Sequence, residues 1–181
     1  LLLLDIKNMF NETSRDACRL HLLKLPELQP IIPYFDLLYT SPNTCWYKSA
    51  ESGYFRKFLQ NEGFAQGCPL SGLFAALTFL RVLLPINVEL NQCRHPHELP
   101  TNSKSFHDDT SIFLHYRDIL WFYKRFQVLG KPNGIQINFS KTNIFTTTSG
   151  ISPLALLPPD QAQHLQEALD FLIAHGAPSP E

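Results

Sequence analysis

The chain has 181 residues, of which 44% are hydrophobic and 12% aromatic, and this is enough for one hydrophobic core in a single domain or a domain with an appendage. The formal net charge of −1 excludes a polycationic nucleic-acid-binding protein, so any basic surface has to be local.

The sequence opens on four leucines without an initiator Met or a basic flank, which is too short for a signal peptide or a membrane span. A short apolar run of this kind predicts a strand buried on both faces over residues 1–4, with Asp5 at its carboxyl end. Apolar residues at helical spacing then predict a helix over 14–25, which stops before Pro26. A second helix is expected over 30–39.

Two extended segments, 43–49 and 54–60, flank a Glu-Ser-Gly turn and predict a β-hairpin. The glycine-punctuated loop GFAQGCPLSG follows, and Pro69 is expected in the first turn of a long helix that runs to about Glu89 and is bent or broken at Pro85. Because Arg81 and Pro85 interrupt its apolar stretch, we interpret this helix as buried rather than membrane-spanning, and we expect no membrane association.

A polar connection over 90–104 leads to a strand near 103–107, a turn at Asp108-Asp109 and a second strand over 110–116. A helix is expected over 118–129, followed by extended chain over 135–147. The segment ISPLALLPPD marks a boundary between a region 1–150 and a region 151–181, which holds a linker and an amphipathic helix ending at Gly176. The fold class predicted is α+β, with an antiparallel sheet packed on helices.

The cysteines are widely spaced and form no CxxC pair, which favours small, buried, reduced thiols in an intracellular protein, nuclear or cytoplasmic. They are Cys18, Cys45, Cys68 and Cys93. Cys93, His95 and His97 match no common zinc-ligand spacing, so a histidine-containing loop is the preferred interpretation.

Acids stand at the ends of two predicted strands, Asp5 in one place and Asp108-Asp109 in the other. If those strands are neighbours in one antiparallel sheet, their carboxylates converge, and Mg²⁺ prefers oxygen ligands of this kind together with substrate phosphates. Two such ions can activate an attacking hydroxyl and stabilise a leaving pyrophosphate. Taken alone, Asp108-Asp109 is more often an exposed turn than a metal site. His107-Asp108 also spells the H-D pair of a metal phosphohydrolase class, although that pair belongs on helices.

Four stretches, in this order, resemble the motifs of reverse transcriptases. LLLLDIKNMFN resembles the strand that ends in the first catalytic Asp, GFAQGCPLSGLF the Q-G-x-P-L-S loop, and FHDD the aromatic-x-D-D hairpin. GIQINFSKTNIF is similar to the G-x-x-x-N-x-x-K-T stretch found especially in non-LTR retroelements and group II introns. The resemblance spans residues 1–145 and implies a polymerase palm.

This resemblance implies roles for individual residues. Asp5, Asp108 and Asp109 would bind two Mg²⁺ ions, or Mn²⁺ as a substitute, together with the backbone carbonyl of Ile6. Phe10 would be a steric gate that excludes the 2′-hydroxyl. The nucleotide and the template base would lie against Gln66 and Gly67, and Lys141 would neutralise the pyrophosphate.

The expected function is RNA-directed DNA polymerisation, with an RNA template, a DNA primer and deoxynucleoside triphosphates as partners of a full-length parent. His107 and Gly72 depart from the family pattern, but neither change removes a ligand. The fingers region of the family should precede Leu1, so the isolated fragment is expected to be inactive. The alternative is a non-catalytic remnant or a co-opted palm-fold binding domain. The sequence does not predict the oligomeric state.

Overall fold

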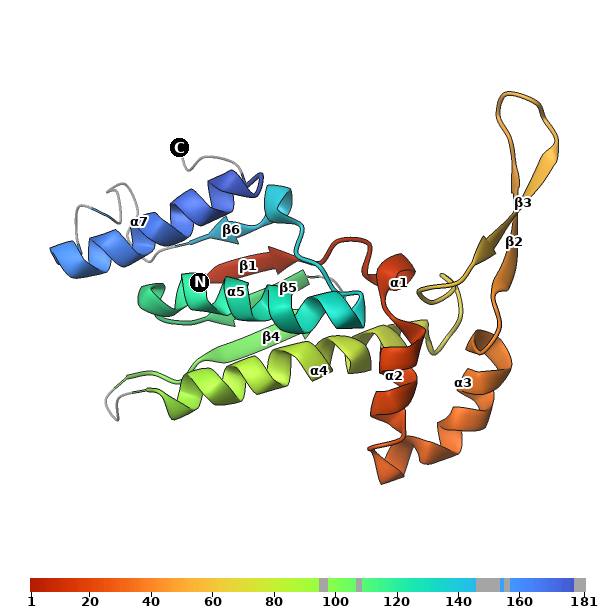
Figure 1. The fold of residues 1–181 in the computed structure, drawn as a ribbon, viewed down its shortest axis with the longest axis horizontal. Helices are drawn as coiled ribbons and strands as arrows, with labels where there is room; N and C mark the ends of the chain where they lie inside the picture. The colour runs from red at the N-terminus through yellow and green to blue at the C-terminus, as the bar shows by residue number, and fades with distance from the viewer. Residues whose placement is uncertain (95–97, 107–108, 146–153, 155–156, 178–181) are drawn as a thin grey trace.

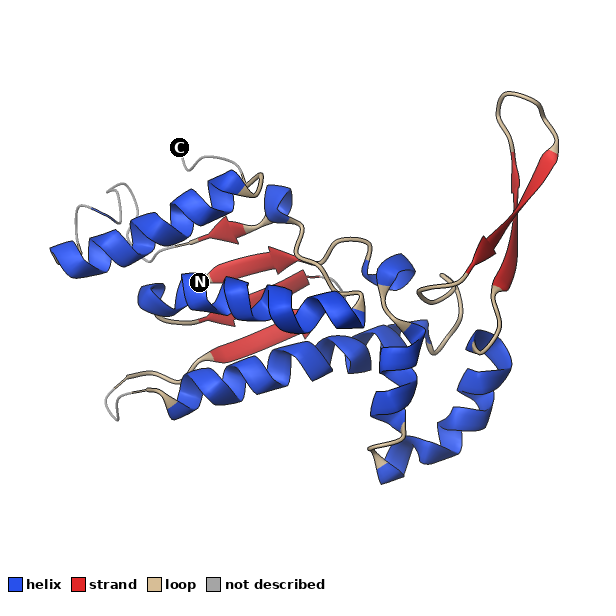
Figure 2. Ribbon diagram, viewed as in Figure 1, coloured by secondary structure: helices blue, strands red, loops and turns tan. Residues whose placement is uncertain are grey.

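The central element is a four-stranded antiparallel sheet with the strand order β4-β5-β1-β6 (Figures 1 and 2). The computed structural model describes residues 1–94, 98–106, 109–145, 154 and 157–177. The strands are β1 (Leu2–Asp5), β4 (Asn102–Phe106), β5 (Asp109–Phe113) and β6 (Asn143–Ile144). Together with the helices described below, this sheet confirms the α+β class.

One face of the sheet is buried and the other is more open. Side chains alternate along β1, so Leu2 and Leu4 point into the core and Leu3 and Asp5 to the opposite face. The core also holds residues of α4 (Ser71–Gln92) and α5 (Ile119–Gly130), the helices that cover the buried face. Asp5 therefore lies on the face away from these helices.

Short helices connect β1 to the hairpin. They are α1 (Met9–Glu12), α2 (Arg15–Leu22), a 3-10 helix Pro26–Ile31 and α3 (Ile32–Tyr39). Ser14 caps α2 by accepting a hydrogen bond from the amide of Ala17. Arg19 binds Asp36 through two hydrogen bonds of 2.7 and 2.9 Å, which joins α2 to α3.

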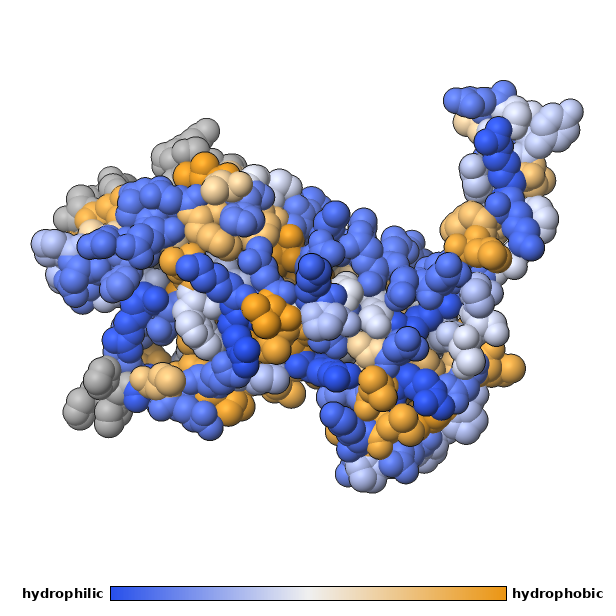
Figure 3. All heavy atoms as spheres, in the orientation of Figure 1, coloured by the Kyte–Doolittle hydropathy of each residue, from blue (hydrophilic) through white to orange (hydrophobic). Residues whose placement is uncertain are grey.

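The hairpin predicted between residues 43 and 60 is confirmed as β2 (Asn43–Lys48) and β3 (Phe55–Gln60), which pair antiparallel. It projects from the body, away from the four-stranded sheet (Figures 1 and 3). At its base, aromatic rings pack edge to face, which anchors α3 and the loop before α4 to one core. These rings belong to Phe35, Tyr39, Phe64 and Phe74.

Helix α4 differs from its prediction at both ends and in the middle. It begins at Ser71, so Pro69 precedes the helix, and it continues to Gln92 without a break at Pro85. Buried Val82, Leu83 and Ile86 surround Pro85, and their packing compensates for the lost backbone hydrogen bond. By length and apolarity α4 could cross a membrane, but 44% of that window is buried inside the protein.

Further segments follow β5. A 3-10 helix, Tyr116–Asp118, begins where the predicted strand should still continue, so β5 is shorter than expected. A 3-10 helix, Lys131–Asn133, follows α5, and another, Phe139–Lys141, interrupts the extended chain predicted over 135–147. Turn-forming residues in this segment bend it toward β1, where Ile137 forms an isolated bridge with Ile6.

The last helix, α7 (Pro159–Ala174), packs along α5. Leu165 and Leu172 are buried in the common core, and Phe171 contacts the ring of Tyr123.

All four cysteines are free, but the expectation that all are buried is wrong. Cys18 is buried against α4, Cys45 and Cys68 are partly buried, and Cys93 at the end of α4 is exposed. Cys93 lies just after the end of α4, where the chain no longer packs against the core, so even a small apolar side chain is exposed there. His95 and His97 lie outside the described residues.

Candidate functional site

Asp5 is held at the end of β1 by two side chains from the segment after α5. Asn138 Nδ2 donates a 2.9 Å hydrogen bond to Asp5 Oδ2, and Lys141 Nζ lies 3.6 Å from Asp5 Oδ1. The Asp5 side chain is 16% exposed and that of Lys141 69% exposed. Lys141 therefore reaches in from solvent, while Asp5 is fixed by its neighbours.

Asp109 lies directly opposite Asp5 across the β1–β5 pair. The amide of Asn138 donates to the backbone carbonyl of Asp5, so the polar backbone groups of Asp5 point toward β6 rather than β5. Asp5 and Asp109 are thus a pair of opposite residues with no backbone hydrogen bond between them. In antiparallel sheets the Cα atoms of such a pair are about 4.5 Å apart, and the two side chains lie on the same face. The sheet brings these two predicted carboxylates together.

His107 and Asp108 lie outside the described residues. The predicted role of Asp108, and the expected separation of about 6 Å between the Asp5 and Asp108 carboxylates, stay predictions.

The backbone around Ile6 is arranged by the same crossing chain. Lys7 donates its amide to the carbonyl of Gln136 at 2.8 Å, next to the bridge between Ile6 and Ile137. Since strand residues alternate the side to which their backbone groups point, the Ile6 carbonyl points toward the β5 side, where Asp109 lies. This orientation suits the ligand role that the sequence resemblance implies for Ile6.

Phe10 follows a tight backbone turn after β1. Asn8 adopts a left-handed conformation with φ 45°, and its side-chain amide donates to Glu12 Oε1 at 2.9 Å. The turn starts α1 immediately, and Phe10 on this short helix is half-buried against the core. Phe10 lines the same cleft as Asp5.

The loop with the predicted residues Gln66 and Gly67 is fastened to α1 through its backbone. Phe64 donates its amide to the carbonyl of Phe10 at 2.5 Å, and Gly63 donates to Thr13 at 2.9 Å. Gly63 has φ 69°, and a Cβ there would overlap the backbone of Phe10 and Asn11, so only glycine permits this approach.

A cleft of about 230 Å³ lies where these segments meet. Of the predicted site residues it is lined by Asp5, Ile6, Phe10, Gln66 and Lys141. Neither Asp109 nor Gly67 is among its lining residues. Gly67 is exposed, with φ 92°.

Sequence reasoning missed four polar residues that line this cleft: Lys7, Asn8, Asn11 and Asn138. Asn138 is the asparagine that matches the G-x-x-x-N-x-x-K-T pattern in the stretch GIQINFSKTNIF, so that motif held a signal for it, although only its lysine was assigned a role. The other three lie shortly after Asp5 in sequence, and that closeness to a predicted metal ligand was the available signal.

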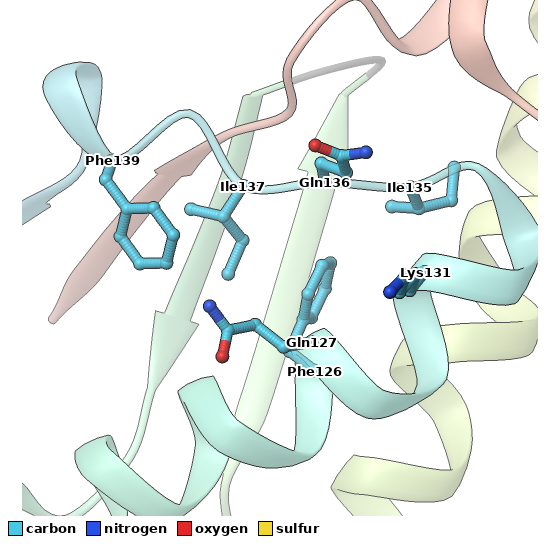
Figure 4. A pocket seen from close by; sticks show the side chains of 7 residues that line it. All are labelled: Phe126, Gln127, Lys131, Ile135, Gln136, Ile137 and Phe139. Carbon is cyan, nitrogen blue, oxygen red and sulfur yellow. The ribbon is translucent and has the colours of Figure 1, made fainter. Parts of the chain in front are cut away.

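A larger cavity of about 410 Å³ lies between α5 and the chain segment 135–139 (Figure 4). Phe126 reaches into it from α5, and Ile137 and Phe139 reach into it from the opposite wall. No predicted site residue lines it, and its walls are largely apolar. It is therefore separate from the cleft at Asp5.

Asp5, Asp109 and the Ile6 carbonyl would offer oxygen atoms from neighbouring backbone positions, which is the donor chemistry of a hard cation such as Mg²⁺. Among the described residues, no cluster of three or more His, Cys, Asp or Glu side chains could hold a metal. These few protein oxygens fit a metal ion that substrate phosphates would also coordinate. Both Asp5 oxygens, however, already contact Asn138 or Lys141.

No protein-family model matches the chain, and no curated protein matches it. Solved structures do, among them structures of telomerase from Candida tropicalis. The telomerase in complex with a TWJ fragment of telomeric RNA has a TM-score of 0.59 at 19% identity and covers 83% of this chain. The apo telomerase has a TM-score of 0.56 at 17% identity, and an apo form truncated from the C-terminal domain 0.55 at 16%.

This chain spans 26% to 31% of the length of these telomerases. Telomerase is a reverse transcriptase, so the comparison supports a reverse-transcriptase-like fold. At these identities the similarity concerns the fold and not the chemistry.

Proposed function

We propose that the chain is the palm-centred part of an RNA-directed DNA polymerase that transfers deoxynucleotides with the help of Mg²⁺. The main support is the register that sets Asp5 opposite Asp109 beside a cleft lined by Phe10, Gln66 and Lys141. The motif stretches and the reverse-transcriptase-like fold agree with this chemistry. The finer non-LTR or group II type rests on the GIQINFSKTNIF stretch alone.

The metals would be held by Asp5, Asp108, Asp109 and the carbonyl of Ile6, and Mg²⁺ bound there would activate the attacking hydroxyl and stabilise the leaving group. Phe10, which lines the cleft, would contact the sugar of the incoming nucleotide and exclude a 2′-hydroxyl. Gln66 and Gly67 would lie against the base pair. Lys141 would exchange its contact with Asp5 for the triphosphate, where its charge opposes the developing negative charge.

One observation favours the second candidate, a palm-fold binding domain without catalysis. Asn138 donates a hydrogen bond to one carboxylate oxygen of Asp5, and the other oxygen forms an ion pair with Lys141. A carboxylate neutralised by a lysine has less need of a cation, and such a site can stabilise the fold without binding metal.

The two functions differ in metal-dependent nucleotide binding. A deoxynucleoside triphosphate is titrated into the 181-residue chain by calorimetry with Mg²⁺ and with EDTA. The polymerase proposal predicts binding that needs Mg²⁺, is lost in Asp5→Asn, and is retained in Asp16→Asn, a matched change at an exposed acid on α2. Binding that is absent, or equal with EDTA, overturns the proposal and favours the binding domain.

Primer extension on an RNA template is a further test. The isolated chain is expected to show none, because holding the template and primer supplies much of the barrier reduction in phosphoryl transfer. Robust extension that Asp108→Asn abolishes would confirm the polymerase and contradict the expected inactivity of the isolated chain.

A further inference from the structure

The β2–β3 hairpin carries an unusual number of exposed aromatic residues. Trp46 is 63% exposed, Phe55 69% and Tyr54 77%, and Tyr47 and Phe58 are each 48% exposed. A two-stranded hairpin has no core of its own and is only marginally stable in water. These rings are therefore available to a ligand, and the hairpin carries them away from the body (Figure 3).

Positive charge accompanies these rings. Residues 43–60 contain Lys48, Arg56 and Lys57 against a single acid, Glu51, in a chain whose net charge is −1. Within the described part of the chain, none of these three cations forms a salt bridge. The hairpin is therefore a local basic surface on a nearly neutral protein.

The strand register assigns these residues to two faces. Trp46 pairs with Lys57 and Lys48 with Phe55, and because these pairs are two residues apart they lie on one face. The opposite face holds Tyr47 with Arg56 and Cys45 with Phe58, and the rings of Tyr47 and Phe58 contact each other at 6.0 Å. The first face, called the Trp46 face below, has two separate aromatic rings with a lysine opposite each.

We propose that the Trp46 face binds a single-stranded polynucleotide, with bases stacked on Trp46 and Phe55 and phosphates near Lys48 and Lys57. Exposed aromatic rings interleaved with cations are the surface that single strands use, since every base offers a ring face to stack and every nucleotide a phosphate. A protein partner is less compatible, because lysine is depleted at protein interfaces. This proposal depends on the hairpin alone and holds even if the metal site does not.

Backbone hydrogen bonds close the turn at the tip of the hairpin. Ser49 donates its amide to the carbonyl of Tyr54 at 3.0 Å, and Gly53 donates to Ser49 at 2.9 Å. Gly53 takes φ 69°, which suits glycine in a turn. The closed tip keeps the two strands in the register that places Trp46 and Phe55 on one face.

The chain has two tryptophans, Trp46 and Trp121. The test uses the full 181-residue chain with Trp121→Phe, so that Trp46 is the only tryptophan left. Fluorescein-labelled oligo(dT), oligo(U) and a duplex are titrated at low and high salt, and anisotropy and quenching of Trp46 fluorescence are both recorded. Binding of the single strands with quenching is expected, and the two oligonucleotides distinguish DNA from RNA as the better ligand.

Variants assign the binding to one face. Trp46→Leu and Phe55→Leu should each weaken single-strand binding about fivefold or more, since stacking contributes about 1–3 kcal/mol per base. Lys57→Gln should weaken it at low salt and reduce the slope of log affinity against log salt by about 0.7. Arg56→Gln, the charge-matched change on the opposite face, should have a smaller effect, and Asp16→Asn, at an exposed acid on α2, should have none. Circular dichroism establishes that each variant is folded.

Three results would overturn the proposal. One is equal loss in Arg56→Gln and Lys57→Gln, and another is no quenching of Trp46 by any oligonucleotide. The third is a dimer of the parent chain that becomes monomeric in Trp46→Leu, because the face would then be an interface with a second copy. If the parent chain binds no single-stranded oligonucleotide but does bind nucleotide with Mg²⁺, this inference alone is contradicted. If it binds the oligonucleotide but no nucleotide with Mg²⁺, only the polymerase proposal is contradicted.

Discussion

Asp5 and Asp109 are partners in the antiparallel register of β1 and β5 and share the sheet face that the helices leave open. Two carboxylates at such a spacing repel each other unless a positive group lies between them. Lys141, whose Nζ lies 3.6 Å from Asp5 Oδ1, places a positive charge beside one of them. In the proposed function a metal ion supplies another, and the lysine contacts phosphate.

The first prediction concerns the contact between the Gly63 loop and α1. Gly63→Ala should lower the free energy of unfolding by more than about 2 kcal/mol, because the added Cβ overlaps the backbone of Phe10 and Asn11 in addition to the strain at positive φ. Gly53→Ala is the control. It has the same φ of 69° with no atom near the added Cβ, so only the strain of about 1 kcal/mol is expected.

Urea unfolding of both variants measures the difference. Equal losses of unfolding free energy in the two variants would show that the loop is not packed against α1 as described. The loop would then not line the cleft through Gln66.

A second prediction uses the buried thiol of Cys18. Burial raises its pKa from 9.0 to about 11. The folded state disfavours the thiolate, so its contribution to stability is complete below pH 9 and is lost as the pH rises from 9 to 11. Over that window the parent chain should lose about 2 kcal/mol more than Cys18→Ala. The free energy of unfolding is measured at each pH, with Cys93→Ala, at an exposed thiol, as the control that should follow the parent.

The general fold was predictable from sequence because it follows from local patterns. The apolar run before Asp5 predicts a central strand, and the paired segments around residues 51–53 predict the hairpin that the structure contains. Helix α4 shows the limit of such patterns, since packing of Val82 and Ile86 on both sides of Pro85 keeps the helix continuous where local preference predicts a break.

The site was only partly predictable. Asp5 and Asp109 stand at strand ends, and that placement is visible in the sequence. The hydrogen bond from Asn138 to Asp5 joins residues 133 positions apart, and no local pattern specifies such a contact. The exposure of Trp46 and Phe55 was also not predictable, because a strand pattern does not say whether a hairpin packs on the body or projects from it.

Phe10→Ala is expected to change sugar selection. The parent chain should bind a deoxynucleoside triphosphate with Mg²⁺ more tightly than the ribonucleotide, and the variant should bind both about equally, because a steric exclusion is removed and no ligand is lost. Competition titrations with the two nucleotides measure the ratio. Phe10→Tyr keeps the ring and should keep the preference, whereas an unchanged ratio in Phe10→Ala would assign this residue to the core alone.

Lys141→Gln should act in opposite directions on the metal and on the nucleotide. Without Lys141 the charge of Asp5 is less neutralised, so Mn²⁺ alone should bind severalfold more tightly. Nucleotide binding in the presence of metal should weaken, because a contact to phosphate is lost. Lys124→Gln, at an exposed lysine of α5, controls for net charge and should change neither. A parallel change in both affinities contradicts the exchange of Lys141 between Asp5 and phosphate.

The most direct test of the account is a Mn²⁺ titration of the 181-residue chain followed by amide NMR spectra. Paramagnetic broadening should appear first at Asp5, Ile6 and Asp109 and should shift to at least tenfold higher Mn²⁺ concentration in Asp5→Asn and in Asp109→Asn. The exposed-acid control Asp16→Asn should behave as the parent does. Broadening that is spread over the surface, or that is unchanged by either site substitution, would contradict the claim that these opposed carboxylates form a metal site.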